Sequence, residues 1–339
     1  MRRMHFAIST IVFSVLLIGG LFLLNKRQSP LLEIINGSSL TDANQKAQLS
    51  ENTEGDFITS DGIRIHYWYF NRGTDVVTIF LHGGPGGSTS DIRQFGQAER
   101  YADKFGSLLA FDQRGGGESE RDATVLGESV TIDRFIQDIN ELREKVIPDH
   151  KVVVFGRSFG GLLGVRYAAS HPEGVLGYLL VVPGQFSSDN VLLEKQRADL
   201  VTSVGGQEEM NRISQQEKDI ALNIRKQQGS PDTAQLDNTN HDNDISVGDA
   251  LRANSDYYQH EEYSLLPNLT NIPTVVVYGA YDMEVPPLAI EAMKPYLPDA
   301  TFVELPGGHG SAYTYEKEFF EGVQKLFDQV KDNQNTERF

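Results

Sequence analysis

The sequence contains no cysteine among its 339 residues. This absence excludes disulfides, thiolate zinc sites and a cysteine nucleophile, and it leaves the redox environment of the protein open. Basic residues are scarce, with 30 Lys and Arg against 47 Asp and Glu, and the formal net charge is −17. Such a charge repels phosphate backbones, and no local basic patch offsets it, so nucleic acid is not an expected partner. A small cationic substrate fits this charge better.

Sequence motifs for metals and nucleotides are also missing. The chain has no GxxxxGK[ST] and no HExxH motif, and its glycine clusters lack the GxGxxG spacing of dinucleotide sites. We therefore expect neither a metal ion nor a cofactor. What is present is an ordinary globular composition, with 39% hydrophobic and 23% charged residues. The length suffices for one large domain with an insertion.

One uncharged apolar run, from Phe6 to Leu24, stands near the amino terminus. Its 19 residues would span roughly the 30 Å hydrocarbon core of a bilayer as a helix. Because the run does not end in a small-residue cleavage site, residues 1–27 are predicted to form a single-pass membrane anchor, with a cleaved signal peptide as the alternative. The basic residues on its two sides are nearly balanced, and we expect the chain beyond it to lie outside the cytoplasm. The polar residues 28–54 then form a tether.

After the tether, apolar strand patterns alternate with amphipathic helical patterns. Val76–Leu81 and Thr274–Tyr278 are short β-rich apolar runs, as expected of strands that are buried on both faces. Thr131–Val146 carries apolar residues at helical spacing, with Thr131 as a candidate N-cap. The alternation predicts an α/β fold with a mostly parallel sheet and helices on both faces, formed by residues 55–184 and 273–339. Functional residues are then expected at the carboxyl ends of the strands.

Residues 185–272 interrupt this alternation. They contain no strong buried-strand pattern, and the pattern around 192–204 and 208–227 is helical. Because the segment lies between two predicted core strands, it is expected to form a helical cap over the strand ends.

The most specific motif is GRSFG, which begins at Gly156 and has the GxSxG pattern between a predicted strand and a predicted helix. At such a turn Ser158 has to adopt a strained conformation that exposes its hydroxyl, and the neighbouring backbone leaves room only for glycine two positions away on either side. The amino terminus of the following helix also favours negative charge nearby. Ser158 is therefore predicted to be the nucleophile of an α/β-hydrolase fold.

A serine hydroxyl is a weak nucleophile and needs a base whose orientation is fixed by an acid. His309, in PGGHG after the last predicted strand, is the candidate base. Asp282 directly follows the Thr274–Tyr278 strand and is the candidate acid, with Glu284 as the nearest rival. The chain order Ser, Asp, His is the one expected for this fold.

The HGGPGG motif after Val76–Leu81 supplies candidate donors for an oxyanion hole. Glycine allows the main chain to approach a tetrahedral intermediate closely, so the N–H groups of Gly83 and Gly84 are candidates. The N–H of Phe159, the residue after the nucleophile, is the partner that the fold supplies.

Together, HGGPGG, DQRGGGES, GRSFGG, the Asp282 segment and GGHG make the sequence similar to the proline iminopeptidase branch of α/β-hydrolases. The similarity covers residues 55–184 and the chain from Pro273 onward. It implies hydrolysis of an N-terminal residue, often proline, from short peptides, through an acyl-enzyme and without a metal or cofactor. The sequence departs from the family at Phe159, where tryptophan is usual, at Glu118, and through a cap without tryptophan.

The resemblance also implies that cap glutamates bind the substrate amine. Glu208 and Glu209 are our candidates, because they follow the flexible Gly205-Gly206 turn and could project into the cleft. An esterase, lactonase or amidase acting on a small molecule remains an alternative, because one fold hosts many acyl-transfer reactions. A membrane-tethered binding protein without turnover is the alternative from another class.

Overall fold

The computed structural model describes residues 51–93, 96–184, 186, 189–227, 244–254 and 262–336. The expected membrane anchor, residues 1–27, and most of the expected tether, residues 28–54, lie outside the described residues. Within the described part, no helix is both long enough and apolar enough to cross a membrane.

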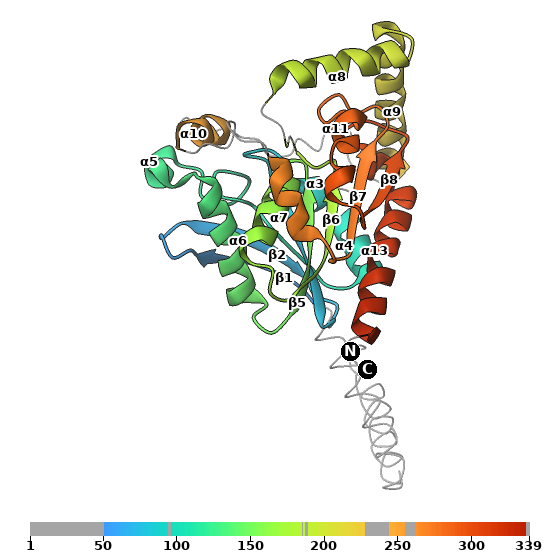
Figure 1. The fold of residues 1–339 in the computed structure, drawn as a ribbon. Coiled ribbons are helices and arrows are strands. Elements are labelled where there is room, and N and C mark those ends of the chain that lie inside the picture. The colour runs from blue at the N-terminus through green and yellow to red at the C-terminus, as the bar shows by residue number, and fades with distance from the viewer. Residues whose placement is uncertain are drawn as a thin grey trace, which may run out of the picture. The chain divides into compact units, whose positions relative to one another are not determined.

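An eight-stranded sheet with the order β1-β2-β4-β3-β5-β6-β7-β8 forms the centre of the fold (Figure 1). The strands are β1 (Asn52–Ile58), β2 (Arg64–Phe70), β3 (Val76–Leu81), β4 (Leu108–Phe111), β5 (Lys151–Arg157), β6 (Val175–Val181), β7 (Thr274–Gly279) and β8 (Thr301–Leu305). Only β2 runs antiparallel to its neighbours β1 and β4, and the other pairs of adjacent strands are parallel. The predicted α/β-hydrolase architecture with a mostly parallel sheet is therefore confirmed.

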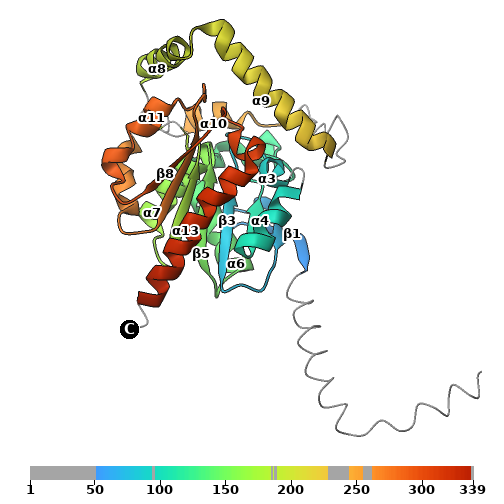
Figure 2. The ribbon, with the colours of Figure 1, turned by 90° about the vertical axis from the view of Figure 1, so that its right-hand side faces the viewer.

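Helices cover both faces of the sheet (Figure 2). The larger ones are α4 (Gln97–Phe105), α6 (Ile132–Val146), α7 (Phe159–Ser170) and α13 (Glu316–Thr336). Successive strand residues enter different cores, so that Val154 packs with α6 and α7 while Phe155 packs with α4 and α13. Both cores exclude water, which explains why the central strands are almost continuously apolar. Thr131 caps α6 as expected, since its side chain accepts a hydrogen bond from the Arg134 N–H.

Strand β1 was not predicted. It contains residues 52–54, which the sequence analysis assigned to the tether. Only Phe57 of this edge strand is buried, and apart from the exposed Ile58 its other residues are polar or glycine, as in a linker.

The segment 185–272 is helical in its described residues and lies between β6 and β7. It contains α8 (Asn190–Ser203), α9 (Gln207–Gln227), α10 (Val247–Asn254) and the 3₁₀ helix η3 (Glu262–Leu269). Gly205 and Gly206 both have positive φ, at 100° and 109°, and allow the chain to turn from α8 into α9. Helices α8 and α9 lie beyond the carboxyl ends of the strands (Figures 1 and 2).

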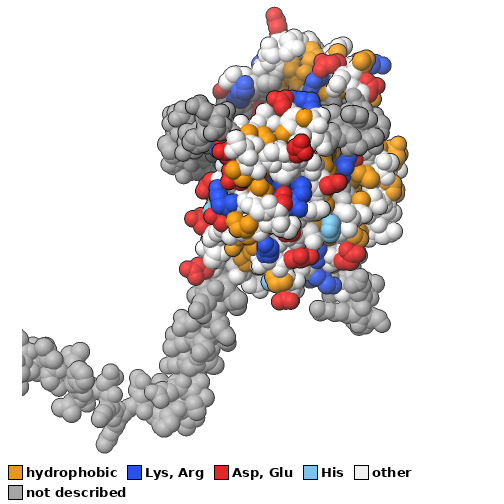
Figure 3. Space-filling view, turned by 90° about the vertical axis from the view of Figure 1, so that its left-hand side faces the viewer, with side chains coloured by type: hydrophobic (Ala, Val, Ile, Leu, Met, Phe, Trp, Pro, Cys, Tyr) orange, Lys and Arg blue, Asp and Glu red, His pale blue; other side chains and the backbone are white. Residues whose placement is uncertain are grey.

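Short helices complete the fold. They are α3 (Ser90–Arg93), α5 (Ala123–Leu126), η2 (Gly127–Ser129), α11 (Pro287–Glu291), η4 (Lys294–Tyr296) and α12 (Ser311–Thr314). Helix α9 contacts α12, and α8 contacts α11. On the face shown in Figure 3, basic side chains lie between acidic ones and do not gather in one patch.

Candidate active site

Ser158 lies at the sharp turn between β5 and α7 and has φ 50° and ψ −120°. This is a strained conformation for a residue with a side chain. A Cβ atom on Gly156 would stand 2.3 Å from the Gly160 oxygen, and one on Gly160 would stand 2.0 Å from the Leu81 oxygen. The two glycines of the GxSxG motif are therefore required by backbone packing, as the sequence predicted.

Ser158, His309 and Asp282 come together at the carboxyl ends of three parallel strands. His309 Nε2 lies 3.1 Å from Ser158 Oγ, and His309 Nδ1 lies 2.8 Å from Asp282 Oδ2. Asp282 is fully buried. Its second oxygen, Oδ1, accepts hydrogen bonds from the Glu284 and Val285 N–H groups at 2.8 and 2.9 Å. These bonds fix the carboxylate that faces the imidazole.

Glu284, the rival carboxylate, lies on the other side of the imidazole ring. Its Oε2 is 3.5 Å from His309 Nε2, the nitrogen that faces Ser158, and its side chain is 71% exposed. Asp282 rather than Glu284 therefore occupies the position that orients His309.

The HGGPGG loop lies against the first turn of α7. A Cβ atom on Gly160 would stand 2.7 Å from the His82 carbonyl oxygen, so only glycine permits this approach. The contact places the His82 carbonyl, which directly precedes Gly83, against the first turn of α7, and the oxyanion-hole role of Gly83, Gly84 and the Phe159 N–H stays a prediction. The geometry is compatible with an oxyanion hole formed by these groups.

The DQRGGGES loop supports the HGGPGG loop through Asp112, a residue whose role the sequence analysis did not anticipate. Asp112 accepts hydrogen bonds from the Thr89 N–H at 2.6 Å and from the Glu118 N–H at 2.7 Å. A Cβ atom on Gly116 would stand 2.2 Å from the Gly87 oxygen. The two loops thus pack backbone to backbone, which gives a physical reason for the two motifs to occur together.

Glu208 and Glu209 lie in the first turn of α9. Glu208 is exposed, and Glu209 forms an ion pair with Arg212 in which Arg212 Nε donates to Glu209 Oε2 at 2.8 Å. This hydrogen bond lowers the pKa of Glu209. The amine-binding role of both residues stays a prediction.

Glu217 is the α9 carboxylate that reaches the His309 loop. Its Oε2 accepts a hydrogen bond from the Gly308 N–H at 2.7 Å. Burial raises the pKa of Glu217, the charge of Asp282 raises it further, and the hydrogen bond from Gly308 opposes both. Glu217 cannot be singled out from the sequence, because many acidic residues occur in this segment and helical spacing alone does not show which one faces the core.

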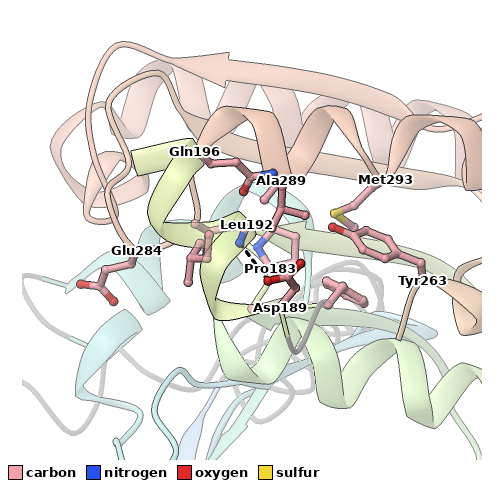
Figure 4. A pocket seen from close by; sticks show the side chains of 12 residues that line it. Pro183, Asp189, Leu192, Gln196, Tyr263, Glu284, Ala289 and Met293 are labelled. Atoms are coloured by element: carbon pink, nitrogen blue, oxygen red, sulfur yellow. Dashed lines mark hydrogen bonds between the residues drawn. The ribbon is translucent and has the colours of Figure 1, made fainter. Parts of the chain in front are cut away.

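A pocket lies beside the Ser158 backbone, between the chain that follows β6 and the loops that follow β7 (Figure 4). Gly184, in its wall, donates its N–H to the Ser158 oxygen at 2.7 Å. The apolar part of the lining is formed by Pro183, Phe186, Leu192, Leu193, Tyr263, Val285, Ala289 and Met293. Asp189 and Glu284 contribute carboxylates. Among the described residues, no group of three or more His, Asp and Glu side chains could hold a metal ion.

Residues 77–314 match the family model described as alpha/beta hydrolase fold. The match covers more than half of the chain and agrees with the sheet order and the Ser158 turn. The protein therefore belongs to the α/β-hydrolase fold family.

Among curated proteins, the chain is similar to proline iminopeptidases. It is 36% identical to the enzyme of Arabidopsis thaliana over 155 residues, which are 45% of this chain and 37% of that protein. It is 27% identical to the enzyme of Neisseria meningitidis serogroup A over 281 residues, 72% of this chain and 86% of that one. The solved structure of a proline iminopeptidase from Mycobacterium smegmatis superposes with a TM-score of 0.58 at 18% identity, covering 83% of this chain and 100% of that chain.

Proposed function

We propose that the protein is a serine hydrolase in which Ser158 is the nucleophile, His309 the general base and Asp282 the acid that orients the base. The observation that carries this proposal is the continuous chain of short contacts from Ser158 Oγ through both imidazole nitrogens to Asp282. Its position at a strained strand-to-helix turn supports the same assignment.

In this reaction Ser158 Oγ attacks the acyl carbon and its proton passes to His309 Nε2. Asp282 stabilises the imidazolium that forms and keeps Nδ1 protonated. The negative oxygen of the tetrahedral intermediate is bound by the Phe159 N–H and by the N–H of Gly83 or Gly84. His309 then gives its proton to the leaving group, and a water molecule, activated by the same nitrogen, hydrolyses the acyl-enzyme.

The proposed substrate is a short peptide with a free amino terminus, cleaved as by a proline iminopeptidase. Similarity to curated proline iminopeptidases supports this class. The acidic net charge and the carboxylates in the pocket also favour a cationic substrate.

Panels of substrates test the proposed class. We expect the full chain in detergent to hydrolyse proline β-naphthylamide and alanine β-naphthylamide with a higher kcat/KM than their N-acetylated forms or p-nitrophenyl acetate. If an acetylated amide or the ester is the best substrate, the aminopeptidase assignment is wrong and an esterase or amidase takes its place.

The proposed location is a membrane, with one span formed by residues 1–27 and the hydrolase outside the cytoplasm. The apolar run Phe6–Leu24 supports it. The full chain is expected in the membrane fraction, whereas a chain that lacks residues 1–26 is expected in the soluble fraction with its activity intact. Equal partitioning of the two forms would contradict the proposal.

A further inference from the structure

We propose that Arg157 is a positioning residue that holds the main chain of His309, the proposed base, in place against Ser158. This inference rests on the serine-hydrolase function proposed above. Arg157 is the last residue of β5 and directly precedes Ser158. Its Nη2 atom donates a hydrogen bond to the His309 carbonyl oxygen at 3.2 Å. One side chain thus joins the end of the nucleophile's strand to the base.

The order of the strands explains why the base needs such a contact. His309 follows β8, and both β6 and β7 lie between β8 and β5 in the sheet. Adjacent strands are about 4.8 Å apart, so β5 and β8 are separated by roughly 14 Å. The loop after β8 must therefore cross the ends of two strands to bring His309 Nε2 within 3.1 Å of Ser158 Oγ. A long side chain from β5 is suited to hold the loop in this position.

The guanidinium of Arg157 contacts the base loop at a second point. Its Cζ atom lies 5.1 Å from the centroid of the Tyr313 ring, in a cation–π arrangement. Tyr313 belongs to α12, which begins two residues after His309. Arg157 Nε and Tyr313 Oη are both shielded from solvent. A charged donor with little access to water makes a stronger hydrogen bond than an exposed one, so Arg157 can fix both His309 and the helix that follows it.

Two opposite charges hold the main chain around His309. The Gly308 N–H donates to the Glu217 carboxylate at 2.7 Å, and the His309 carbonyl accepts from the Arg157 guanidinium at 3.2 Å. Each charge thus meets the end of a peptide dipole that it stabilises. Asp282 fixes only the side chain of the base, through Nδ1. The main-chain contacts therefore add a constraint that the triad itself does not supply.

This constraint should act on the rate and not on substrate binding. Proton transfer from Ser158 Oγ requires His309 Nε2 at hydrogen-bond distance, and a displacement of about 1 Å can lower a rate by roughly 100-fold. The lining of the pocket beside Ser158, described above, does not include Arg157. Loss of the Arg157 side chain should therefore lower kcat and leave KM nearly unchanged.

The test compares Arg157→Ala with Arg72→Ala in the full chain. Arg72 is a partly buried arginine that also donates to a main-chain carbonyl, that of Asn71, but it follows β2, beside the amino end of β4 and away from the site. We expect Arg157→Ala to lower kcat for p-nitrophenyl acetate by roughly 10- to 100-fold, with KM within about threefold of wild type. Arg72→Ala should change neither value. Arg157→Lys, which keeps a cationic donor, should recover part of kcat.

Added methylguanidine distinguishes positioning from a general loss of stability. It can occupy the space left by the Arg157 side chain and donate to the His309 carbonyl. The kcat of Arg157→Ala should therefore rise with its concentration and saturate, whereas that of Arg72→Ala should not rise. Measuring Tm and titrating the active sites with a fluorophosphonate restrict the comparison to folded protein.

Failure of this proposal can be told apart from failure of the proposed function. If the wild-type protein and Ser158→Ala hydrolyse the ester equally, the serine-hydrolase function is wrong and Arg157 has no base to position. If Ser158→Ala is inactive but Arg157→Ala keeps the wild-type kcat, the function stands and the role of Arg157 is overturned. A higher KM at unchanged kcat, or a lost kcat that neither lysine nor methylguanidine restores, would also overturn it.

Discussion

Glu217 Oε2 accepts a hydrogen bond from the Gly308 N–H at 2.7 Å, one residue before His309. A helix of the segment 185–272 thereby contacts the loop that carries the proposed base. Gly307 leaves room for this side chain, because a Cβ atom there would stand 2.6 Å from Glu217 Oε1. A partly buried carboxylate thus joins α9 to the loop of the proposed base.

This carboxylate should make stability depend on pH. Burial raises the folded-state pKa of Glu217 above its unfolded value, so the ionised form is the one that folding disfavours. Protonated Glu217 therefore contributes to the free energy of unfolding at low pH, and this contribution is lost as pH rises through the folded-state pKa. We expect Glu217→Gln, which keeps a hydrogen-bond acceptor, to raise Tm relative to wild type at pH 7 and to raise it less at pH 4. A lower Tm than wild type at pH 7 would show that the charge is stabilising.

The contribution of Asp61 to folding stability should have the opposite pH dependence. Burial acts to raise its pKa, but hydrogen bonds from Arg114 and Thr59 outweigh it and lower the pKa of Asp61 to about 2. Arg114 is fully buried and donates from Nη1 to Asp61 Oδ2 at 3.0 Å. The stabilisation is present above the unfolded pKa of about 3.9 and fades as pH falls toward 2.

We therefore expect Asp61→Asn to lower the free energy of unfolding by about 1–2 kcal/mol at pH 7, after allowance for solvent screening, and by much less at pH 2.5. Urea denaturation at the two pH values measures this. Asp103→Asn removes a more exposed ion pair with Arg72 and should cost under about 0.5 kcal/mol. A loss for Asp61→Asn that is equal at both pH values would contradict the assignment.

Replacing two different glycines of α7 with alanine should destabilise the protein to very different extents. Gly160→Ala places a methyl group 2.0 Å from the Leu81 oxygen, which is backbone and cannot move aside. Gly164→Ala meets first the side chain of Val154, at 3.3 Å. We expect Gly160→Ala to cost more than about 3 kcal/mol or to prevent folding, and Gly164→Ala to cost about 1 kcal/mol or less. Thermal melts of both variants with similar Tm would refute the packing argument.

Substitutions of Asp282 and Glu284 should differ in their effect on the rate of hydrolysis of a simple ester. Asp282→Asn removes the carboxylate at Nδ1 and should lower kcat for p-nitrophenyl acetate by about 100-fold or more, because the imidazole loses its orientation and charge partner. Glu284→Gln should leave this rate nearly unchanged. If the variant at Glu284 were the slower one on the ester, the acid would be misassigned.

Site residues could be predicted from the sequence when the fold itself determines their positions. Ser158, Asp282 and His309 each follow a different strand. Strands β5 and β7 are buried apolar runs that are readily recognised, whereas the edge strand β8 is only partly buried. Because parallel strands end at one edge of the sheet, their following residues meet there. The GxSxG motif also predicted the two glycines around Ser158: a Cβ atom on Gly156 would meet backbone of the same turn, and one on Gly160 would meet the backbone of Leu81 and His82.

Contacts between distant segments could not be predicted. Glu217 is one of several glutamates on an amphipathic helix, and only the packing of α9 against α12 brings it to Gly308. Asp112 supports the HGGPGG loop through the hydrogen bond from the Thr89 N–H, which joins two separate loops and leaves no local sequence pattern. Strand β1 escaped prediction because an edge strand with one buried residue has almost no hydrophobic periodicity.

Covalent labelling tests the central claim most directly. A fluorophosphonate reacts with a serine only when its hydroxyl is activated and accessible, and the modified residue can be located by peptide mass spectrometry. The account predicts a single adduct on Ser158 in the wild-type protein, no adduct in Ser158→Ala and a strongly slowed reaction in His309→Ala, with all three proteins folded. An adduct on another residue, or undiminished labelling of the Ser158→Ala protein, would contradict it.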